Sequence, residues 1–174
     1  MRVVIAMDSF KGSLSSIEAG KAVAEGVRCA DGTIECVVCP VADGGEGTSA
    51  ALTEGLYGET VRVRVTGPFG EKVTAEYGVK DDLAILEMAQ AAGLPLVPQD
   101  KRNPMKTTTY GVGEMLRDAI NRGCKRFILG IGGSATNDGG AGMLQALGFD
   151  LLDKDGNPVP FGAEGLRVLA KIEN

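Results

Sequence analysis

The segment Gly130-Ile-Gly-Gly-Ser-Ala-Thr-Asn-Asp-Gly-Gly-Ala-Gly142 follows directly on the apolar run Phe127-Ile-Leu129. Six of its thirteen residues are glycine, and a glycine inside a helix or strand costs about 0.5 to 1 kcal/mol relative to alanine. The segment therefore predicts a strand-to-helix loop whose backbone comes close to another group. Hydroxyl, amide and carboxylate side chains lie among the glycines: Ser134, Thr136, Asn137 and Asp138. This mixture suits a phosphate with a metal ion, and a tight connection without a ligand is the alternative.

Two earlier loops have the same character, and each follows an apolar run. The first is Asp8-Ser-Phe-Lys-Gly-Ser-Leu-Ser15 after residues 2–7, and the second is Pro40-Val-Ala-Asp-Gly-Gly-Glu-Gly-Thr48 after residues 33–39. Short runs rich in Val and Ile are typical of parallel strands that are covered on both faces. Right-handed crossovers would put both loops at the same edge of a sheet, which is where open α/β sheets bind ligands.

Helices are expected after both of these loops. Ser15-Ser-Ile-Glu18 has the spacing of a capping box, so a helix is predicted from there to about Arg28. A second helix is predicted over residues 48–56. Each loop would then connect a strand to a helix, which gives two βα units.

The sequence pattern changes at about residue 59. Val61, Val63 and Val65 alternate with polar residues, the turn Gly67-Pro-Phe-Gly70 follows, and residues 73–79 alternate again before an apolar run at 83–89. Strands joined by such short turns predict an antiparallel meander. We therefore expect an α/β protein of two domains. Residues 1–58 would form an incomplete layer of parallel βα units, and residues 59–174 a mixed α/β domain that carries the 130–142 loop.

The rest of the second domain alternates between helices and strands. The patterns predict a loop over residues 90–105, helices over 107–122, 141–147 and 166–172, and strands over 125–131 and 149–152. Two βα units are too few to cover both faces of a parallel sheet, so we expect further strands beyond Asn174.

The composition excludes several classes of protein. With 44% hydrophobic and 24% charged residues, the 174-residue chain is ordinary for a globular protein. A net charge of -5 without a Lys/Arg run argues against a nucleic-acid partner, and no apolar run approaches the ~20 residues that span a bilayer. We expect a cytoplasmic protein without a membrane partner. Because the chain has no histidine, proton transfer must fall to carboxylates, lysine, tyrosine or water.

The glycine-rich segment matches only one of the two common nucleotide-binding motifs. The chain contains no Gly-x-x-x-x-Gly-Lys-Ser/Thr, which excludes a P-loop. Gly130-Ile-Gly132-Gly-Ser-Ala135 does satisfy the dinucleotide pattern G-x-G-x-x-A after a strand, so a nicotinamide-dependent oxidoreductase is an alternative. The glycines at 139 and 140 speak against it, because in that motif the helix begins within the first glycines.

Three acids embedded among glycines are the candidate chemical groups. Phosphoryl transfer needs anionic ligands for Mg²⁺, a carboxylate that accepts the proton of the alcohol, and a cation for the phosphates. We assign Asp43 and Asp138 as metal ligand or base, without choosing between these roles, and Glu46 as a second acid. Lys11 is the candidate phosphate cation. The alternatives are turn formers or helix caps for the acids, and a solvated loop charge for Lys11.

The remaining candidates would bind substrate or nucleotide. Those in or beside the three loops are Asp8, Ser9, Ser13, Gly44, Gly45, Gly132, Gly133, Ser134, Thr136 and Asn137. Arg102 and Lys106, ahead of three threonines, would neutralise a small carboxylate. A polar loop with a redundant helix cap is the alternative for this last segment.

Four segments in the same order resemble a known family. Asp8-Ser-Phe-Lys-Gly-Ser-Leu-Ser15, the 40–48 loop, Arg102-Asn-Pro and Gly130 through Met143 together resemble the bacterial glycerate kinases of the two-domain type, and the resemblance covers the whole chain. It implies phosphorylation of a hydroxyl of D-glycerate to a phosphoglycerate, with ATP and Mg²⁺. It also implies a flavodoxin-like α/β domain, interrupted by a domain with a restriction-endonuclease-like fold, and a site between the two.

Members of this family are considerably longer than the present chain, so the resemblance implies an N-terminal portion whose first domain is completed beyond Asn174. Three functions stay open at this stage: a glycerate kinase, an inactive portion of one, and a nicotinamide-dependent oxidoreductase. A homodimer is also left open. The choice between the 2- and the 3-hydroxyl as acceptor depends on a geometry of about 1 Å.

Overall fold

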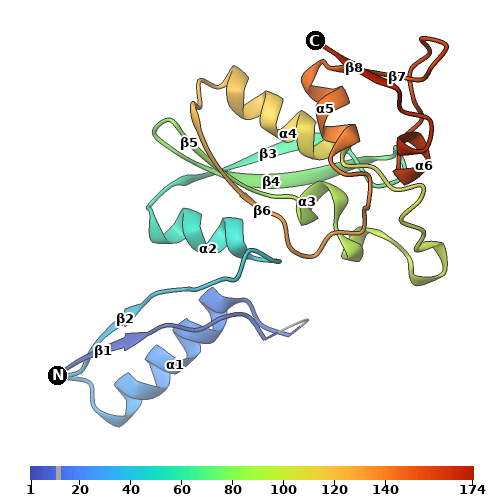
Figure 1. Ribbon diagram of the computed structural model, residues 1–174. Helices are drawn as coiled ribbons and strands as arrows, with labels where there is room; N and C mark the ends of the chain where they lie inside the picture. The colour runs from blue at the N-terminus through green and yellow to red at the C-terminus, as the bar shows by residue number, and fades with distance from the viewer. Residues whose placement is uncertain (11–12) are drawn as a thin grey trace.

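Residues 1–39 form a small unit of two strands and one helix (Figure 1). The structure is a computed structural model and describes residues 1–10 and 13–174. Strands β1 (Arg2–Ile5) and β2 (Glu35–Val38) pair in parallel, and helix α1 (Ser16–Ala30) connects them. The helix packs closely on the strands, because a Cβ atom at Gly20 would lie 2.5 Å from Val38 Cγ1. The first predicted βα unit is confirmed.

The predicted start of α1 is also confirmed. The Ser15 hydroxyl accepts a hydrogen bond from the Glu18 N–H at 3.1 Å, and the Glu18 carboxylate accepts one from the Ser15 N–H at 2.9 Å. The two bonds satisfy donors that a helix leaves unpaired at its N-terminus. They fix the first turn of α1 next to the loop that follows β1.

The larger body is built on a mixed sheet of four strands in the order β3-β4-β5-β6. Its strands are β3 (Glu59–Thr66), β4 (Lys72–Lys80), β5 (Leu83–Glu87) and β6 (Arg126–Gly130). The pairs β3/β4 and β4/β5 are antiparallel, which confirms the predicted meander, and β5/β6 is parallel. The parallel pair brings the ends of β5 and β6, Glu87 and Gly130, into register at one edge of the sheet.

Helices cover both faces of this sheet (Figure 1). Helix α4 (Tyr110–Asn121) packs on one face, where Val65, Tyr77, Leu86 and Met115 are buried in the main hydrophobic cluster. Helix α5 (Ala141–Leu147) packs against α4, and the Arg117 guanidinium joins them by donating to the Ala146 carbonyl at 2.9 Å. Helix α2 (Thr48–Gly55) lies on the opposite face, where Gly78 leaves room for the Thr53 side chain.

The position of α2 moves the expected boundary between the two domains. We predicted that this helix completes a second βα unit on the first sheet and that the boundary falls near residue 58. Instead α2 contacts β3, β4 and β5. Its buried residues, among them Ser49, Ala51 and Thr53, face the larger body. The chain therefore crosses between the two bodies in residues 39–47, ahead of α2.

The last predicted helix, residues 166–172, is wrong. The structure has a short helix α6 (Ala163–Leu166) and then strand β8 (Lys171–Glu173), which pairs in antiparallel fashion with β7 (Asp150–Leu152). The Ala170 N–H donates to the Leu152 carbonyl at 2.8 Å, so pairing with a distant strand overrides the local helical pattern. The predicted loop over residues 90–105 contains three short helical turns: α3 (Ala89–Ala92) and 3-10 turns at Leu94–Leu96 and Gln99–Lys101.

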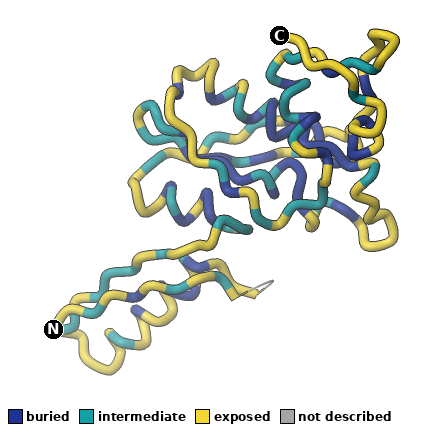
Figure 2. The backbone as a smooth tube through the Cα atoms, viewed as in Figure 1, coloured by how far each residue is buried: buried dark blue, intermediate teal, exposed yellow. Residues whose placement is uncertain are grey.

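Burial is concentrated in the larger body (Figure 2). In the N-terminal unit, the buried hydrophobic residues among those described are Ile5, Ala19 and Ala24. The main hydrophobic cluster of the larger body is bigger and contains residues from β3, β4, β5, α3 and α4. None of the helices in the described part of the chain has the length and apolar character needed to cross a membrane.

Candidate active site

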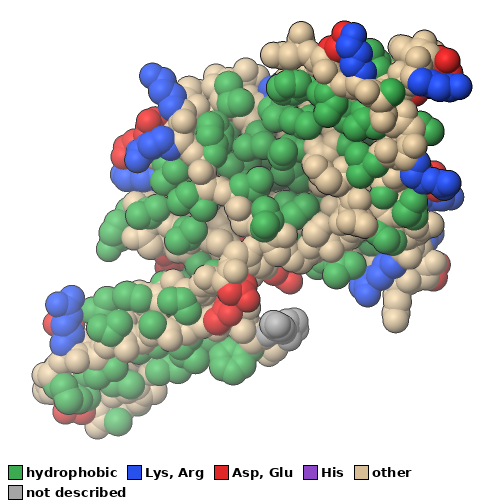
Figure 3. Space-filling view, in the orientation of Figure 1, with side chains coloured by type: hydrophobic (Ala, Val, Ile, Leu, Met, Phe, Trp, Pro, Cys, Tyr) green, Lys and Arg blue, Asp and Glu red, His purple; other side chains and the backbone are tan. Residues whose placement is uncertain are grey.

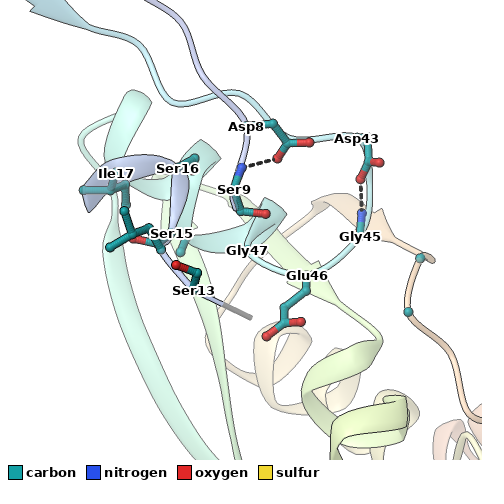
Figure 4. A pocket seen from close by; sticks show the side chains of 14 residues that line it. Asp8, Ser9, Ser13, Ser15, Ser16, Ile17, Asp43, Gly45, Glu46 and Gly47 are labelled. Atoms are coloured by element: carbon teal, nitrogen blue, oxygen red, sulfur yellow. Dashed lines mark hydrogen bonds between the residues drawn. The ribbon is translucent and has the colours of Figure 1, made fainter. Parts of the chain in front are cut away.

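A cavity of about 620 Å³ lies between the two bodies. Its walls come from the loop after β1, the start of α1, the loop between β2 and α2, and the loop after β6 (Figure 4). Three predicted loops thus meet around one space. The predicted site residues that line it are Asp8, Ser9, Ser13, Asp43, Gly45, Glu46, Gly132 and Gly133.

Asp8 and Asp43 are adjacent because the β1/β2 pairing continues past the strand ends. The Cys39 N–H donates to the Ile5 carbonyl at 2.8 Å, and the Val41 N–H donates to the Met7 carbonyl at 3.1 Å. Each aspartate also organises its own loop. Asp8 Oδ1 accepts from the Ser9 N–H at 2.7 Å, and Asp43 Oδ1 accepts from the Gly45 N–H at 3.0 Å.

Both carboxylates keep their second oxygen available to a ligand. Among the described residues, Oδ2 of Asp8 and of Asp43 takes part in no hydrogen bond, and both side chains are exposed. An oxygen of this kind can bind a cation or accept a proton, whereas the bonded Oδ1 fixes the direction in which it points.

Glycines allow the second and third loops to touch through their backbones. The Gly132 N–H donates to the Gly44 carbonyl at 2.8 Å. A Cβ atom at Gly132 would lie 2.6 Å from Gly45 Cα, and one at Gly130 would lie 2.9 Å from the Gly44 oxygen. No larger residue fits at either position, so these glycines are explained by the contact between the loops. The prediction that the loops face each other is confirmed.

Asp138 lies elsewhere, and its position does not fit the predicted role as metal ligand or base. The side chain is only 1% exposed and does not line the cavity. Its Oδ2 accepts from the N–H groups of Thr109 at 2.9 Å and Gly142 at 3.2 Å, and Oδ1 accepts from the Gly140 N–H at 3.1 Å. The Thr109 hydroxyl donates as well, at 2.9 Å. The carboxylate joins the starts of α4 and α5, and so acts as a helix cap.

The hydroxyls of the glycine-rich segment also point into their own loop. Ser134 Oγ and Thr136 Oγ1 are 2.8 Å apart, and Ser134 Oγ accepts from the Thr136 N–H at 3.0 Å. Neither side chain lines the cavity, and nor does the exposed Asn137. The predicted phosphate contacts are therefore limited to the first part of the segment, Gly132 and Gly133.

Arg102 and Lys106 are exposed and do not line the cavity. The threonines after them are buried and used internally, since the Thr107 hydroxyl donates to the Ala135 carbonyl at 2.7 Å. The alternative interpretation, a polar loop before a helix, fits this arrangement better than a carboxylate site. Lys11, the predicted phosphate cation, lies outside the described residues.

The described walls of the cavity are acidic. Asp8, Asp43 and Glu46 contribute carboxylates, no Lys or Arg is among the described lining residues, and Figure 3 shows acidic side chains at the junction of the two bodies. The described residues hold no group of three or more His, Cys, Asp or Glu that could bind a metal by themselves. This donor set still fits Mg²⁺, which is commonly bound by one or two carboxylates together with substrate phosphates and water.

One residue with unusual surroundings was missed in the sequence. Glu87, the last residue of β5, is 0% exposed, and its Oε2 accepts from the Ser49 N–H at 3.2 Å and the Ser49 hydroxyl at 3.4 Å. Oε1 has no hydrogen-bond partner among the described residues. Burial raises the pKa of Glu87, the backbone amides of Ser49 and Gly47 oppose this, and the nearby Glu46 carboxylate reinforces it. The signal in the sequence was a glutamate that ends a wholly apolar strand.

Fold and cavity together define a class: a two-body α/β protein whose acidic, glycine-rich loops surround a cavity at the carboxyl ends of strands, where open α/β sheets bind ligands. A family model described as "Glycerate kinase family" matches residues 3–174. The "Glycerate kinase" of Halalkalibacterium halodurans is 50% identical over 98% of this chain, and the "Glycerate 2-kinase" of Escherichia coli is 49% identical over 99% of it. The chain belongs to the glycerate kinase family.

A solved structure agrees with this assignment. The crystal structure of "putative glycerate kinase 2" from Salmonella typhimurium LT2 matches with a TM-score of 0.88 and 49% identity, over 99% of this chain and 47% of that one. The chain spans about half the length of the curated relatives it matches, 46% in both cases named above. The α/β class is confirmed, and the flavodoxin-like and restriction-endonuclease-like assignments stay predictions.

The nicotinamide alternative loses its structural basis. That motif needs a helix that starts within the first glycines, but α5 begins only at Ala141. The intervening residues hold Gly139 and Gly140 at positive φ, 59° and 82°, which no helical turn accepts.

Proposed function

We propose that this chain supplies the acidic part of the active site of a kinase that transfers a phosphoryl group from ATP to a hydroxyl of D-glycerate. The observation that carries the proposal is the meeting of Asp8, Asp43 and Glu46 with the Gly132–Gly133 backbone in one cavity, in a chain of the glycerate kinase family. Phosphoryl transfer depends on positioning and on charge stabilisation, and both can be provided by such loops.

Asp43 is the residue to which we assign the central role. Its Oδ1 is held by the Gly45 N–H, and its Oδ2 would either bind Mg²⁺ or accept the proton of the glycerate hydroxyl. Asp8, the adjacent carboxylate in the cavity, would hold the ion together with Asp43, and Glu46 is the further acid of the site. When bound, Mg²⁺ would neutralise phosphate charge. Ser9 and Ser13 would donate hydroxyls to the phosphates, and Lys11 stays the proposed phosphate cation on the basis of sequence.

Asp138 receives a different role from the one first assigned. Because its two oxygens are occupied by four donors in a buried position, we assign it the task of holding α4 and α5 together behind the glycine-rich loop. Arg102 and Lys106 would reach the substrate carboxylate only if the exposed loop that carries them moved. A cytoplasmic location and a homodimer stay predictions.

The test is an assay of ADP release with a panel of small hydroxy acids. It should be run on this chain and on a version extended past Asn174 to the length of its relatives. We expect the extended version to release ADP with D-glycerate and Mg²⁺, and chelation of the metal to abolish it. Absence of glycerate-dependent ADP release from the extended version would refute the proposal. Activity that appears only after extension would mean that this chain alone is an inactive portion.

The acceptor hydroxyl can be determined in the same experiment. The relative from Escherichia coli is named a glycerate 2-kinase and is 49% identical, so we propose the 2-hydroxyl as acceptor. Phosphorus NMR of the product distinguishes 2-phosphoglycerate from 3-phosphoglycerate. Difference spectra on addition of NAD(H) test the oxidoreductase alternative, for which we expect no change.

A further inference from the structure

Glu87 lies directly beneath the acidic loop without lining the cavity. It ends β5, and its partner in the parallel ladder is Gly130, the first residue of the glycine-rich loop. Its Oε2 reaches across to the N–H and hydroxyl of Ser49 in the first turn of α2. One side chain therefore contacts the helix that follows the 43–48 loop and stands in register with the start of the 130–142 loop.

The contact joins two segments that are far apart in the sequence. Ser49 and Glu87 are separated by 38 residues, and the bond joins the helix to the central part of the sheet. Within the loop itself the Gly44 N–H donates to Thr48 Oγ1 at 3.1 Å. The bond from Ser49 to Glu87 attaches the end of this loop to β5. Asp43, Gly45 and Glu46 of the same loop line the cavity.

The unpaired oxygen indicates the protonation state. Oε1 is buried and has no partner in the described part of the chain. No Lys or Arg in that part forms an ion pair with Glu87, and the charged groups of the neighbouring loop are Glu46 and Asp43. The charged residues of the elements around it are paired elsewhere: Lys72 with Glu114, Glu76 with Arg62 and Lys80 with Asp81 in β4, Glu54 with Lys21 in α2, and Arg126 with Asp82 in β6. A carboxylate without a cation in a buried position costs far more than the uncharged acid.

We propose that Glu87 is a positioning residue that fixes the 43–48 loop and the start of α2 beneath the cavity, and that it does so as an uncharged carboxyl group. The expected effect on kcat/KM rests on the proposed kinase function. The expected effect on stability rests only on the geometry around Glu87. An uncharged Glu87 keeps an acceptor for the Ser49 N–H. It also avoids adding a further negative charge beneath a loop that would bind phosphates.

Glutamine and alanine variants separate the two parts of the proposal. Glu87→Gln is uncharged and keeps an acceptor for Ser49, so we expect it to retain close to normal kcat and KM in the extended protein. Glu87→Ala removes the acceptor, and we expect kcat/KM for ATP to fall by about tenfold or more, mainly through KM, because the loop loses one of its anchors to the larger body. Equal impairment of both variants would overturn the uncharged state. Unimpaired Glu87→Ala would overturn the positioning role.

Thermal unfolding against pH provides a readout that needs no activity. The pKa of Glu87 is raised by burial, so the native state holds the proton at pH values where the unfolded chain has lost it, and stability falls as the pH rises through that interval. Glu87→Gln has no such proton. We therefore expect its Tm to rise relative to that of the parent protein as the pH is raised above the ordinary pKa of a glutamate, about 4.3.

Glu114→Gln is the matched control. Burial acts to raise the pKa of Glu114, but hydrogen bonds from Thr66 and Lys72 outweigh it and the net shift is downward. Its loss should lower Tm at neutral pH and matter less as the pH falls, the opposite trend. A flat difference for Glu87→Gln would overturn the uncharged state. If no version releases ADP, the kinase proposal fails, and the unfolding series still decides the state of Glu87.

Discussion

Asp43 and Asp138 are each followed by two glycines in the sequence, but their surroundings in the structure differ. Asp43 is exposed at the cavity with one oxygen available, whereas Asp138 is buried with both oxygens occupied. A carboxylate that already accepts four hydrogen bonds has little capacity left for a metal ion or a proton. Substitution of each aspartate should therefore affect different properties of the protein.

Asp43→Asn should abolish most of the turnover and leave the fold intact. Removal of a catalytic acid or base typically lowers the rate by about 10²- to 10⁴-fold, and Asn keeps the acceptor for the Gly45 N–H. The measurement is kcat for ADP release by the extended protein, with thermal unfolding as a check on folding. Asp155→Asn, at an exposed aspartate in the turn after β7, is the control and should behave like the parent. Normal turnover of Asp43→Asn would end the role assigned to this residue.

Asp138→Ala should instead destabilise the protein. It leaves the donors at the starts of α4 and α5 without an acceptor in a buried position, which should lower the free energy of unfolding by about 2 to 4 kcal/mol. Urea denaturation measures this loss, and Asp138→Asn, which keeps one acceptor oxygen, should lose less. Unchanged stability combined with a hundredfold loss of kcat would restore a chemical role to Asp138.

At the scale of elements, the 43–48 loop and the loop after β6 can touch only because glycines, which have no side chain, occupy the contact. Gly132→Ala would bring a Cβ atom to 2.6 Å from Gly45 Cα, where the backbone itself must move. Overpacking of this kind lowers the free energy of unfolding by about 1 to 3 kcal/mol. It should also lower kcat/KM, because Gly45 and Glu46 would be displaced from their positions at the cavity. Denaturation and ADP release measure the two effects.

Gly26→Ala is the control for this substitution. Gly26 lies within α1, with nothing within 4 Å of the added methyl group. Alanine should stabilise the helix by about 0.5 to 1 kcal/mol and leave turnover unchanged. If both glycine variants raised stability, the close approach of the two loops would be wrong.

Elements with a local cause were predictable from the sequence. The capping box placed the start of α1, alternating valines placed β3, and the apolar residues at 141–147 placed α5. The errors concern elements whose partners lie far away in the chain. Residues 171–173 form a strand because β7 is available to pair with them, and α2 packs on β4 because Gly78 admits Thr53. Neither partner can be seen in a local pattern.

At the scale of the whole molecule, the two bodies should differ in stability. The buried hydrophobic residues described in the N-terminal unit are few and mostly small, so this unit has little apolar burial to oppose its opening. In the 174-residue chain we expect the amides of β1 and β2 to exchange hydrogen faster than those of β4 and β5. Hydrogen exchange read by mass spectrometry measures the difference. Equal protection in both bodies would contradict the expectation.

The candidate site was predictable only as far as its loops. Glycine and acid content identified the three loops, and the cavity unites eight of the predicted residues. Which side of a loop faces the ligand depends on tertiary packing, so Ser134, Thr136 and Asp138 were assigned to the site although their side chains serve the loop and the helix starts. Glu87 was missed because its burial follows from the docking of α2.

The connection between the two bodies has a consequence for ligand release. Gly44 is hydrogen-bonded to Gly132, so Asp43 stays with the larger body, whereas Asp8 follows β1 in the smaller one. Val41 is still bonded to Met7 of the smaller body, so a rotation about residue 42 would separate these two carboxylates and leave the distances within the 43–48 loop unchanged. A ligand held by both acids would oppose that rotation, and its departure would leave the smaller body free to turn.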